Sequence, residues 1–276
     1  MKLKSLFLCT FFLSGIAHAE DKVVKLATLN WEPYIGQDLK NKGLFALIME
    51  AAFKEEGYKV ELSFTPWARA VNEAKNGLLD GLMPEYYDSA PDGRLKDFVF
   101  SNSFFKGPVG FLTLKSKNIK YNKNDDLNKT YDELKQYKFG VVRDYINEAK
   151  FDARLYEFNK GKADGTKNLA AEIANSDEIN INKLKGDRID IIFIDKYVAE
   201  YFIDKNFKND KNKFIFLEPA VALNDLYIAF SKKAKDSEAK MNAFNNGMKK
   251  IKENGILKKL IKNDIYFRVL LQKQTK

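Results

Sequence analysis

Short apolar runs alternate with helically spaced apolar positions along the first part of the chain. Between residues 44 and 56, apolar side chains recur at intervals of three and four, which is the spacing of one helix face. The runs at 23–28 and 58–64 have the length and composition of strands. Pro66 then opens a second helix, and a third strand begins at Asp80-Gly81. This order predicts an α/β lobe with a parallel sheet.

A polar segment divides this pattern in two. From Lys115 to Asp132 the composition turns polar and rich in Lys, Asn and Asp. Beyond it a strand is predicted at Phe139–Val142, and a helix is expected from about Ile146. The run Ile191–Ile194 is apolar throughout, as in a strand that is covered on both faces. The pattern therefore predicts a second α/β lobe after the first.

The first residues have the features of a targeting segment. Lys2 and Lys4 precede a mostly apolar stretch, and Ala17-His18-Ala19 has the small-x-small pattern of a cleavage site. The apolar stretch is too short to span a bilayer. We expect residues 1–19 to be a secretory signal peptide that is cut after Ala19, and the mature protein to lie in the periplasm.

Cleavage at this point removes the only cysteine and the only histidine of the chain. Without them the protein has no disulfide, no thiolate nucleophile, no Ser-His-Asp triad and no Cys/His zinc site. The stretch 122–133 spaces Asn and Asp like a calcium loop, but Leu127 stands where that turn needs glycine. We therefore expect neither a metal nor an organic cofactor.

The charge of the chain is basic but dispersed. It carries 47 Lys and Arg residues against 38 Asp and Glu residues, for a formal net charge of +9. These residues are spread along the whole sequence, and no nucleic-acid-binding motif accompanies them. The excess fits surface solubility better than a phosphate-binding face. We expect no nucleic-acid partner and a monomeric protein.

Several polar and aromatic residues fall near the carboxyl ends of the predicted strands, where open α/β sheets bind their ligands. Trp31 follows the first strand, Trp67 opens the second helix, and Asp195 follows the apolar strand of the second lobe. Arg94 lies in the loop after the third strand, and its planar fork of donors suits a carboxylate. A solvated Arg94, a Trp31 packed under its loop and an Asp195 that only caps a helix are the alternatives.

Several short sequence motifs lie in a specific order along nearly the whole mature chain. They are Trp31-Glu32-Pro33-Tyr34, Pro66-Trp67-Ala68-Arg69-Ala70, Asp80-Gly81, Arg94 with Phe100-Ser101, Phe139-Gly140-Val141-Val142-Arg143, Asp187-Arg188-Ile189-Asp190 with Asp195, and Asn254-Gly255-Ile256-Leu257. In this order they resemble the bacterial periplasmic solute-binding proteins of family 3, the polar amino-acid type with a two-lobed type II fold.

The resemblance implies roles for individual residues. Arg94 would hold the α-carboxylate of a ligand from the first lobe, and Asp195 would accept its ammonium group from the second lobe. Trp31 and Trp67 would enclose the ligand side chain, since facing rings suit a flat, apolar or cationic group.

The chain also departs from the family pattern. Glu85 and Tyr87 stand in the segment before Arg94, where small hydroxyl residues are usual. In the second lobe Arg143 and Tyr145 belong to a turn that replaces the usual Gly-Thr/Ser-Thr. We expect these four residues to contribute to the ligand site, and an aromatic, extended or modified ligand is an alternative to an ordinary amino acid.

The resemblance further implies the layout and the function. We expect an α/β fold of two Rossmann-like lobes with a central cleft and a two-strand hinge, lobe one at 20–112 and 223–276 and lobe two at 113–222. The protein would capture a small carboxylate-bearing solute, such as an amino acid or a derivative, by hinge closure and deliver it to a membrane ABC permease, without catalysis. Two alternatives stay open: an enzyme similar to cyclohexadienyl dehydratases, with Glu85 or Asp195 as general acid, and a binding protein that serves a receptor.

Overall fold

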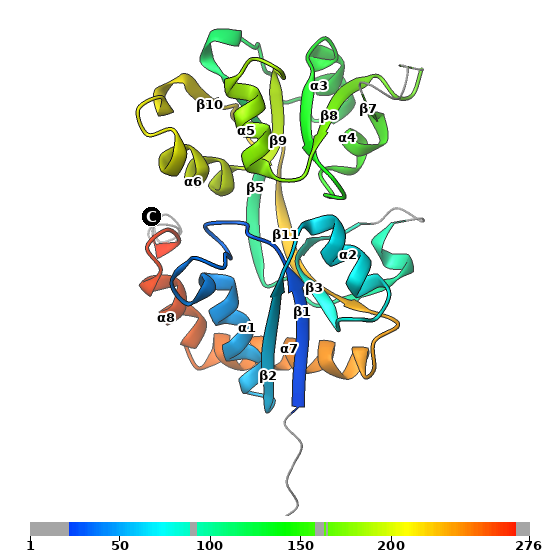
Figure 1. Cartoon of the computed structure of the whole chain (residues 1–276), viewed down its shortest axis with the longest axis vertical. Helices are drawn as coiled ribbons and strands as arrows, with labels where there is room; N and C mark the ends of the chain where they lie inside the picture. Colours follow the sequence, from blue (N-terminus) through cyan, green and yellow to red (C-terminus); the bar gives the residue numbers. More distant parts are fainter. Residues whose placement is uncertain (1–21, 89–92, 158–162, 164, 269–276) are drawn as a thin grey trace, which may run out of the picture.

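Two α/β lobes stand one above the other, and two long strands run between them (Figure 1). The computed structural model describes residues 22–88, 93–157, 163 and 165–268. The expected signal peptide, residues 1–19 with cleavage after Ala19, lies outside these residues. The predicted fold class, an α/β chain of two lobes, is confirmed, whereas the exact lobe boundaries stay a prediction.

The strands of the described residues form one sheet that passes through both lobes. Its order is β2-β1-β3-β11-β5-β9-β6-β8-β7, with β4 paired to β11 and β10 paired to β5. The strands are β1 (Lys22–Thr28), β2 (Tyr58–Phe64), β3 (Gly81–Tyr86), β4 (Phe98–Phe100), β5 (Phe105–Leu114), β6 (Phe139–Val142), β7 (Leu155–Glu157), β8 (Leu169–Ala174), β9 (Ile191–Asp195), β10 (Phe214–Phe216) and β11 (Ala222–Ser231).

The strand directions explain where the site lies. In the first lobe β1 is parallel to β2 and β3, and in the second lobe β6 is parallel to β8 and β9. Parallel neighbours end on the same edge of a sheet, and in both lobes this carboxyl edge faces the other lobe (Figure 1). The side chains that follow these strands therefore meet between the lobes.

Strands β5 and β11 connect the lobes as an antiparallel pair. The first half of β5 pairs with β11, and its second half pairs with β9 of the second lobe, where Val109 lies opposite Asp195. Strand β11 continues into the first lobe and pairs there with β3 and β4. This geometry supports a two-strand hinge, because both lobes share these strands.

Eight α-helices cover the sheet within the described residues, and none of them is both long and apolar enough to cross a membrane. They are α1 (Leu44–Lys54), α2 (Trp67–Lys75), α3 (Leu127–Leu134), α4 (Ala149–Arg154), α5 (Asp177–Lys185), α6 (Lys196–Asn206), α7 (Ser237–Glu253) and α8 (Ile256–Asn263). Helices α1 and α7 approach so closely that a Cβ atom on Gly247 would collide with the carbonyl oxygen of Ala52.

Three local expectations are corrected by the structure. Strand β3 continues through Tyr86, so Glu85 lies on a buried strand and not in a loop, which Arg94 makes possible by pairing with its carboxylate. Helix α4 begins at Ala149 and not near Ile146, because Glu148 caps it by accepting from the amide of Phe151. The polar segment expected as loop contains α3, which Asp126 caps through the amide of Asn128.

Candidate functional site

The carboxyl ends of five strands supply the walls of one site between the lobes. Trp31 follows β1 and Tyr86 ends β3 in the first lobe. Tyr145 follows β6, Asp177 follows β8 and Asp195 ends β9 in the second lobe. The predicted location of the site at the strand ends is therefore consistent with the topology.

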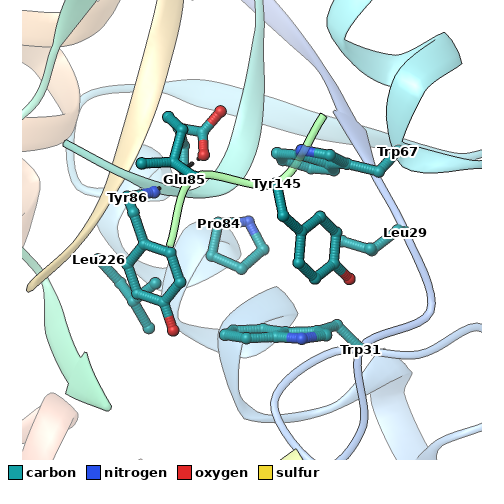
Figure 2. A pocket seen from close by; sticks show the side chains of 9 residues that line it. Leu29, Trp31, Trp67, Pro84, Glu85, Tyr86, Tyr145 and Leu226 are labelled. Atoms are coloured by element: carbon teal, nitrogen blue, oxygen red, sulfur yellow. Dashed lines mark hydrogen bonds between the residues drawn. The ribbon is translucent and has the colours of Figure 1, made fainter. Parts of the chain in front are cut away.

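Two small adjoining cavities lie among these residues, and Figure 2 shows the first of them. Each encloses about 20 Å³, the space of about one water molecule, and both are lined by Trp31, Tyr86, Tyr145 and Ile146. The first is completed by Leu29, Trp67, Pro84, Glu85 and Leu226, and the second by Val109, Asn147, Asp177, Phe193, Ile194 and Asp195. Both lobes contribute walls to these cavities.

The two tryptophans stand on opposite sides of the first cavity. Figure 2 shows the indole of Trp67 and the indole of Trp31 facing each other across Pro84 and Tyr145. Both tryptophans are buried, with 4% and 5% of their surface exposed, respectively. The structure thus brings together the aromatic pair that the resemblance implies.

Arg94 lines neither cavity, and its guanidinium binds the carboxylate of Glu85, which lines the first one. Its Nε donates to Oε2 of Glu85 over 2.9 Å, and the Glu85 side chain is only 3% exposed. Burial raises the pKa of Glu85 to about 7, although the adjacent guanidinium of Arg94 acts to lower it. The fork expected to hold a ligand carboxylate is therefore engaged by Glu85.

A second donor of the Arg94 side chain reaches the second lobe. Its Nη2 donates to the backbone carbonyl of Asp144 over 2.6 Å, and the indole Nε1 of Trp67 donates to the same oxygen over 3.2 Å. Asp144 has a φ of 60°, the left-handed conformation, in the turn after β6. The carbonyl oxygen of Asp144 in the second lobe thus accepts hydrogen bonds from two side chains of the first lobe, which connects the two walls of the site.

Asp195 lies on the opposite wall and accepts hydrogen bonds from neutral donors of the protein. Its carboxylate accepts from the hydroxyl of Tyr34 at 3.0 and 3.1 Å and caps α6 by accepting from the amides of Tyr197 and Val198. Burial raises the pKa of Asp195 to about 7 in spite of these hydrogen bonds. The capping role considered for Asp195 is confirmed, and it coexists with a position in the cavity wall.

A stack of three rings supports this part of the site. The ring of Tyr34 stacks on Trp31 at 4.6 Å and on Phe267 at 4.9 Å. Phe267 follows α8 near the C-terminal end of the described residues and is 1% exposed. It also makes an edge contact with Tyr197 of the second lobe at 5.9 Å. The end of the chain therefore supports the wall formed by Trp31.

Asp177 is a buried carboxylate that sequence reasoning missed. It is 3% exposed and accepts from the hydroxyl of Tyr145 at 3.3 Å. Burial raises the pKa of Asp177 to about 7, against hydrogen bonds from Tyr145 and Trp31 that lower it. Its sequence signal is its place directly after a strand, but that strand, β8, was not predicted.

Two of the expected residues lie away from the cavities. Tyr87 is 49% exposed and packs against Phe100 and Tyr227 at an outer groove. Arg143 is exposed and lines neither cavity, because the turn after β6 directs only Tyr145 and the carbonyl of Asp144 inward. Their contribution to the ligand site stays a prediction.

Buried negative charge outweighs buried positive charge in this site. The carboxyl groups of Glu85, Asp177 and Asp195 line the cavities, and the nearby guanidinium of Arg94 pairs with Glu85. Within the ranges that the structure describes, neither Asp177 nor Asp195 forms an ion pair. No group of three or more His, Cys, Asp or Glu side chains in those ranges could hold a metal ion. The arrangement suits a small cationic or ammonium-bearing molecule.

The fold and the site define a class. Two α/β lobes that share two strands and close around a site at their strand ends form a type II solute-binding protein. A family model of bacterial extracellular solute-binding proteins, family 3, matches residues 25–264, and the chain belongs to this family. The resemblance that the sequence motifs carry is confirmed. Among curated proteins the sequence has no significant match.

Solved structures with the same fold include binding proteins and a sensor. An amino-acid ABC transporter substrate-binding protein, AbpA from Streptococcus pneumoniae, bound to L-arginine, is similar with a TM-score of 0.64 at 20% identity, over 87% of this chain and 93% of that chain. An ancestral amino-acid-binding protein, a precursor of cyclohexadienyl dehydratase, gives 0.62 at 21% identity, over 89% and 95%. A histidine kinase sensor domain gives 0.69 at 14% identity, over 89% and 97%. At these identities the likeness shows the fold.

Proposed function

We propose that this chain is a periplasmic solute-binding protein that captures a small amino-acid-like solute between its lobes and delivers it to an ABC permease. One observation carries the proposal: buried rings from both lobes line two adjoining cavities, which also contain the buried carboxyl groups of Glu85 in the first lobe and of Asp177 and Asp195 in the second. A solute that contacts both walls stabilises the closed form, since it binds that form better than the open one. Family membership and an arginine-bound neighbour support the amino-acid class.

A thermal-shift screen of the purified mature protein tests this proposal. The compounds are amino acids, the amines derived from them, short peptides and small carboxylates. A compound at about 100 times its dissociation constant is expected to stabilise the folded protein by about 2.7 kcal/mol. Trp67→Ala removes one ring of the cavity wall and is expected to weaken the shift, whereas Lys54→Ala, on the exposed surface of α1, leaves it unchanged. Equal shifts in both variants would refute binding between the lobes.

The permease is tested in cells. Uptake of the labelled compound identified by the screen is expected to require the intact gene and to be restored by the wild-type chain but not by Trp67→Ala. A receptor partner, to which the sensor-like neighbour points, gives unchanged uptake and a lost transcriptional or motile response instead.

An enzyme of the cyclohexadienyl dehydratase type is the second candidate. The observation that favours it is burial of Glu85 and Asp195, which raises the pKa of each to about 7, a value that suits a general acid. Incubation with prephenate or arogenate separates the two functions. Turnover that Glu85→Gln or Asp195→Asn abolishes would replace the binding proposal, and the absence of turnover supports it.

A further inference from the structure

Arg94 is paired with a carboxylate of the protein itself, that of Glu85. Its Nε donates to Glu85 and its Nη2 donates to the carbonyl of Asp144, so two of the five N–H donors of the guanidinium are engaged by the protein and its charge is paired with Glu85. The pair is well shielded, with 17% of the Arg94 side chain and 3% of the Glu85 side chain exposed. A ligand carboxylate at this position would displace Glu85 and leave it buried without its cation, which is strongly unfavourable.

The opposite wall lacks a cation. Among the described residues, Asp177 and Asp195 accept hydrogen bonds from neutral donors, namely the hydroxyls of Tyr145, Tyr34 and Tyr86, the indole of Trp31 and two backbone amides. Burial raises the pKa of both carboxyl groups to about 7, because no positive charge compensates them. A bound cation would supply this compensation.

The rings between these walls suit the same kind of group. Trp31 contacts Tyr86 edge-on at 6.1 Å, and Trp67 contacts Tyr145 edge-on at 6.3 Å. The hydroxyl of Tyr86 is buried beside the Asp195 carboxylate, its oxygen accepts no hydrogen bond from the described residues, and Tyr86 lines both cavities. Ring faces attract cations, and a free hydroxyl oxygen accepts from an ammonium group.

We infer that Glu85 takes the place of the ligand carboxylate at Arg94, so that the cleft selects amines that lack a free α-carboxylate over the corresponding amino acids. The ammonium group lies toward Asp177 and Asp195, and the rest of the molecule lies between the indoles of Trp31 and Trp67. This inference rests on the proposed function and specifies its substrate class. An added ligand carboxylate would enter a site with three buried carboxyl groups and one neutralised guanidinium, and it would be repelled.

Matched pairs of compounds test the inference. L-arginine with agmatine, L-lysine with cadaverine, and L-tyrosine with tyramine each differ only in the α-carboxylate. Isothermal titration of the mature protein is expected to give an affinity for the amine about tenfold or more above that for the amino acid, in whichever pair binds. An amino acid that binds tighter than its amine overturns the inference and leaves the proposed function standing. If neither these pairs nor the wider screen bind, both are overturned.

A variant at Glu85 gives an independent readout. Glu85→Gln keeps the shape of the side chain but frees the charge of Arg94, so affinity for the amino acid should rise about tenfold while affinity for the amine falls. Glu253→Gln, at the exposed end of α7, is the matched control and should leave both affinities unchanged. Circular dichroism confirms folding of each variant. An unchanged preference in folded Glu85→Gln contradicts the assigned role of Glu85.

Discussion

Replacing Asp177 with asparagine should make the protein more stable and its site weaker. Asp177 is 3% exposed, and burial raises its pKa to about 7. Asparagine has nearly the same shape, and its carbonyl oxygen can still accept from the hydroxyl of Tyr145. The substitution therefore removes the free-energy cost of a buried negative charge with little change in packing.

The magnitude follows from proton linkage. In the unfolded chain an aspartate has a pKa of about 3.9, so between about pH 4 and pH 7 the folded wild type holds a proton that the unfolded chain has lost. Stability therefore falls as pH rises through this window. At about 1.4 kcal/mol per pKa unit, the shift amounts to roughly 4 kcal/mol at most. Asp177→Asn should be more stable than wild type by about 2–4 kcal/mol near pH 8, and the difference should vanish near pH 4.

Urea unfolding followed by tryptophan fluorescence, at several pH values between about 4 and 8, measures the free energy of unfolding of the wild type and of Asp177→Asn. Asp38→Asn serves as a control, because Asp38 is exposed and carries no buried charge. The free energy of unfolding of Asp38→Asn should stay close to that of the wild type at every pH. If Asp177→Asn is no more stable than wild type near pH 8, the carboxyl group is not held in the environment described, and the reasoning fails.

Three further substitutions probe the supports of the site and the core. Tyr34→Phe removes the hydroxyl that donates to Asp195 and should lower the free energy of unfolding near pH 8 by about 1.5–3 kcal/mol in urea titrations; an unaltered midpoint would contradict a bond to an ionised carboxylate. Phe267→Ala removes a ring that is 1% exposed, so calorimetry should show a loss of about 3 kcal/mol, whereas a frayed terminus would show none. Gly247→Ala places a methyl group against the carbonyl of Ala52 and should cost about 1–3 kcal/mol by thermal unfolding; neutrality would mean that α1 and α7 separate easily.

The strand pattern could be predicted where side-chain periodicity alone selects a strand. Strand β2 has the predicted bounds, Tyr58–Phe64, and β9 coincides with the apolar run at Ile191–Ile194 with one added residue. Strand β8 was missed because Leu169–Ala174 is rich in Ala and carries Glu, which favour helices. Its conformation comes from pairing with β6 and β7, which are distant in sequence, so tertiary context overrides local preference.

The sequence predicts where the candidate site lies but not which of its charged side chains pair with each other. Trp31, Trp67 and Tyr145 follow from the rule that ligands bind at the carboxyl ends of strands, and all three line the cavities. The pairing of Arg94 with Glu85 joins residues nine positions apart across a strand end, and no periodicity encodes it. The second donor contact of the Arg94 side chain, to Asp144, spans the two lobes and exists only once both have folded.

These charges connect stability with ligand choice. The buried carboxyl groups of Asp177 and Asp195 lower the free energy of unfolding of the ligand-free protein. Under the proposed function, a bound cation would compensate these charges and raise that free energy. Glu85 differs, because Arg94 already compensates it. The wall around Glu85 is therefore complete without a ligand, whereas the wall around the two aspartates is completed by one. Under the proposed function, this asymmetry between the walls, more than the presence of an arginine, decides which end of an amino-acid-like molecule the cleft recognises.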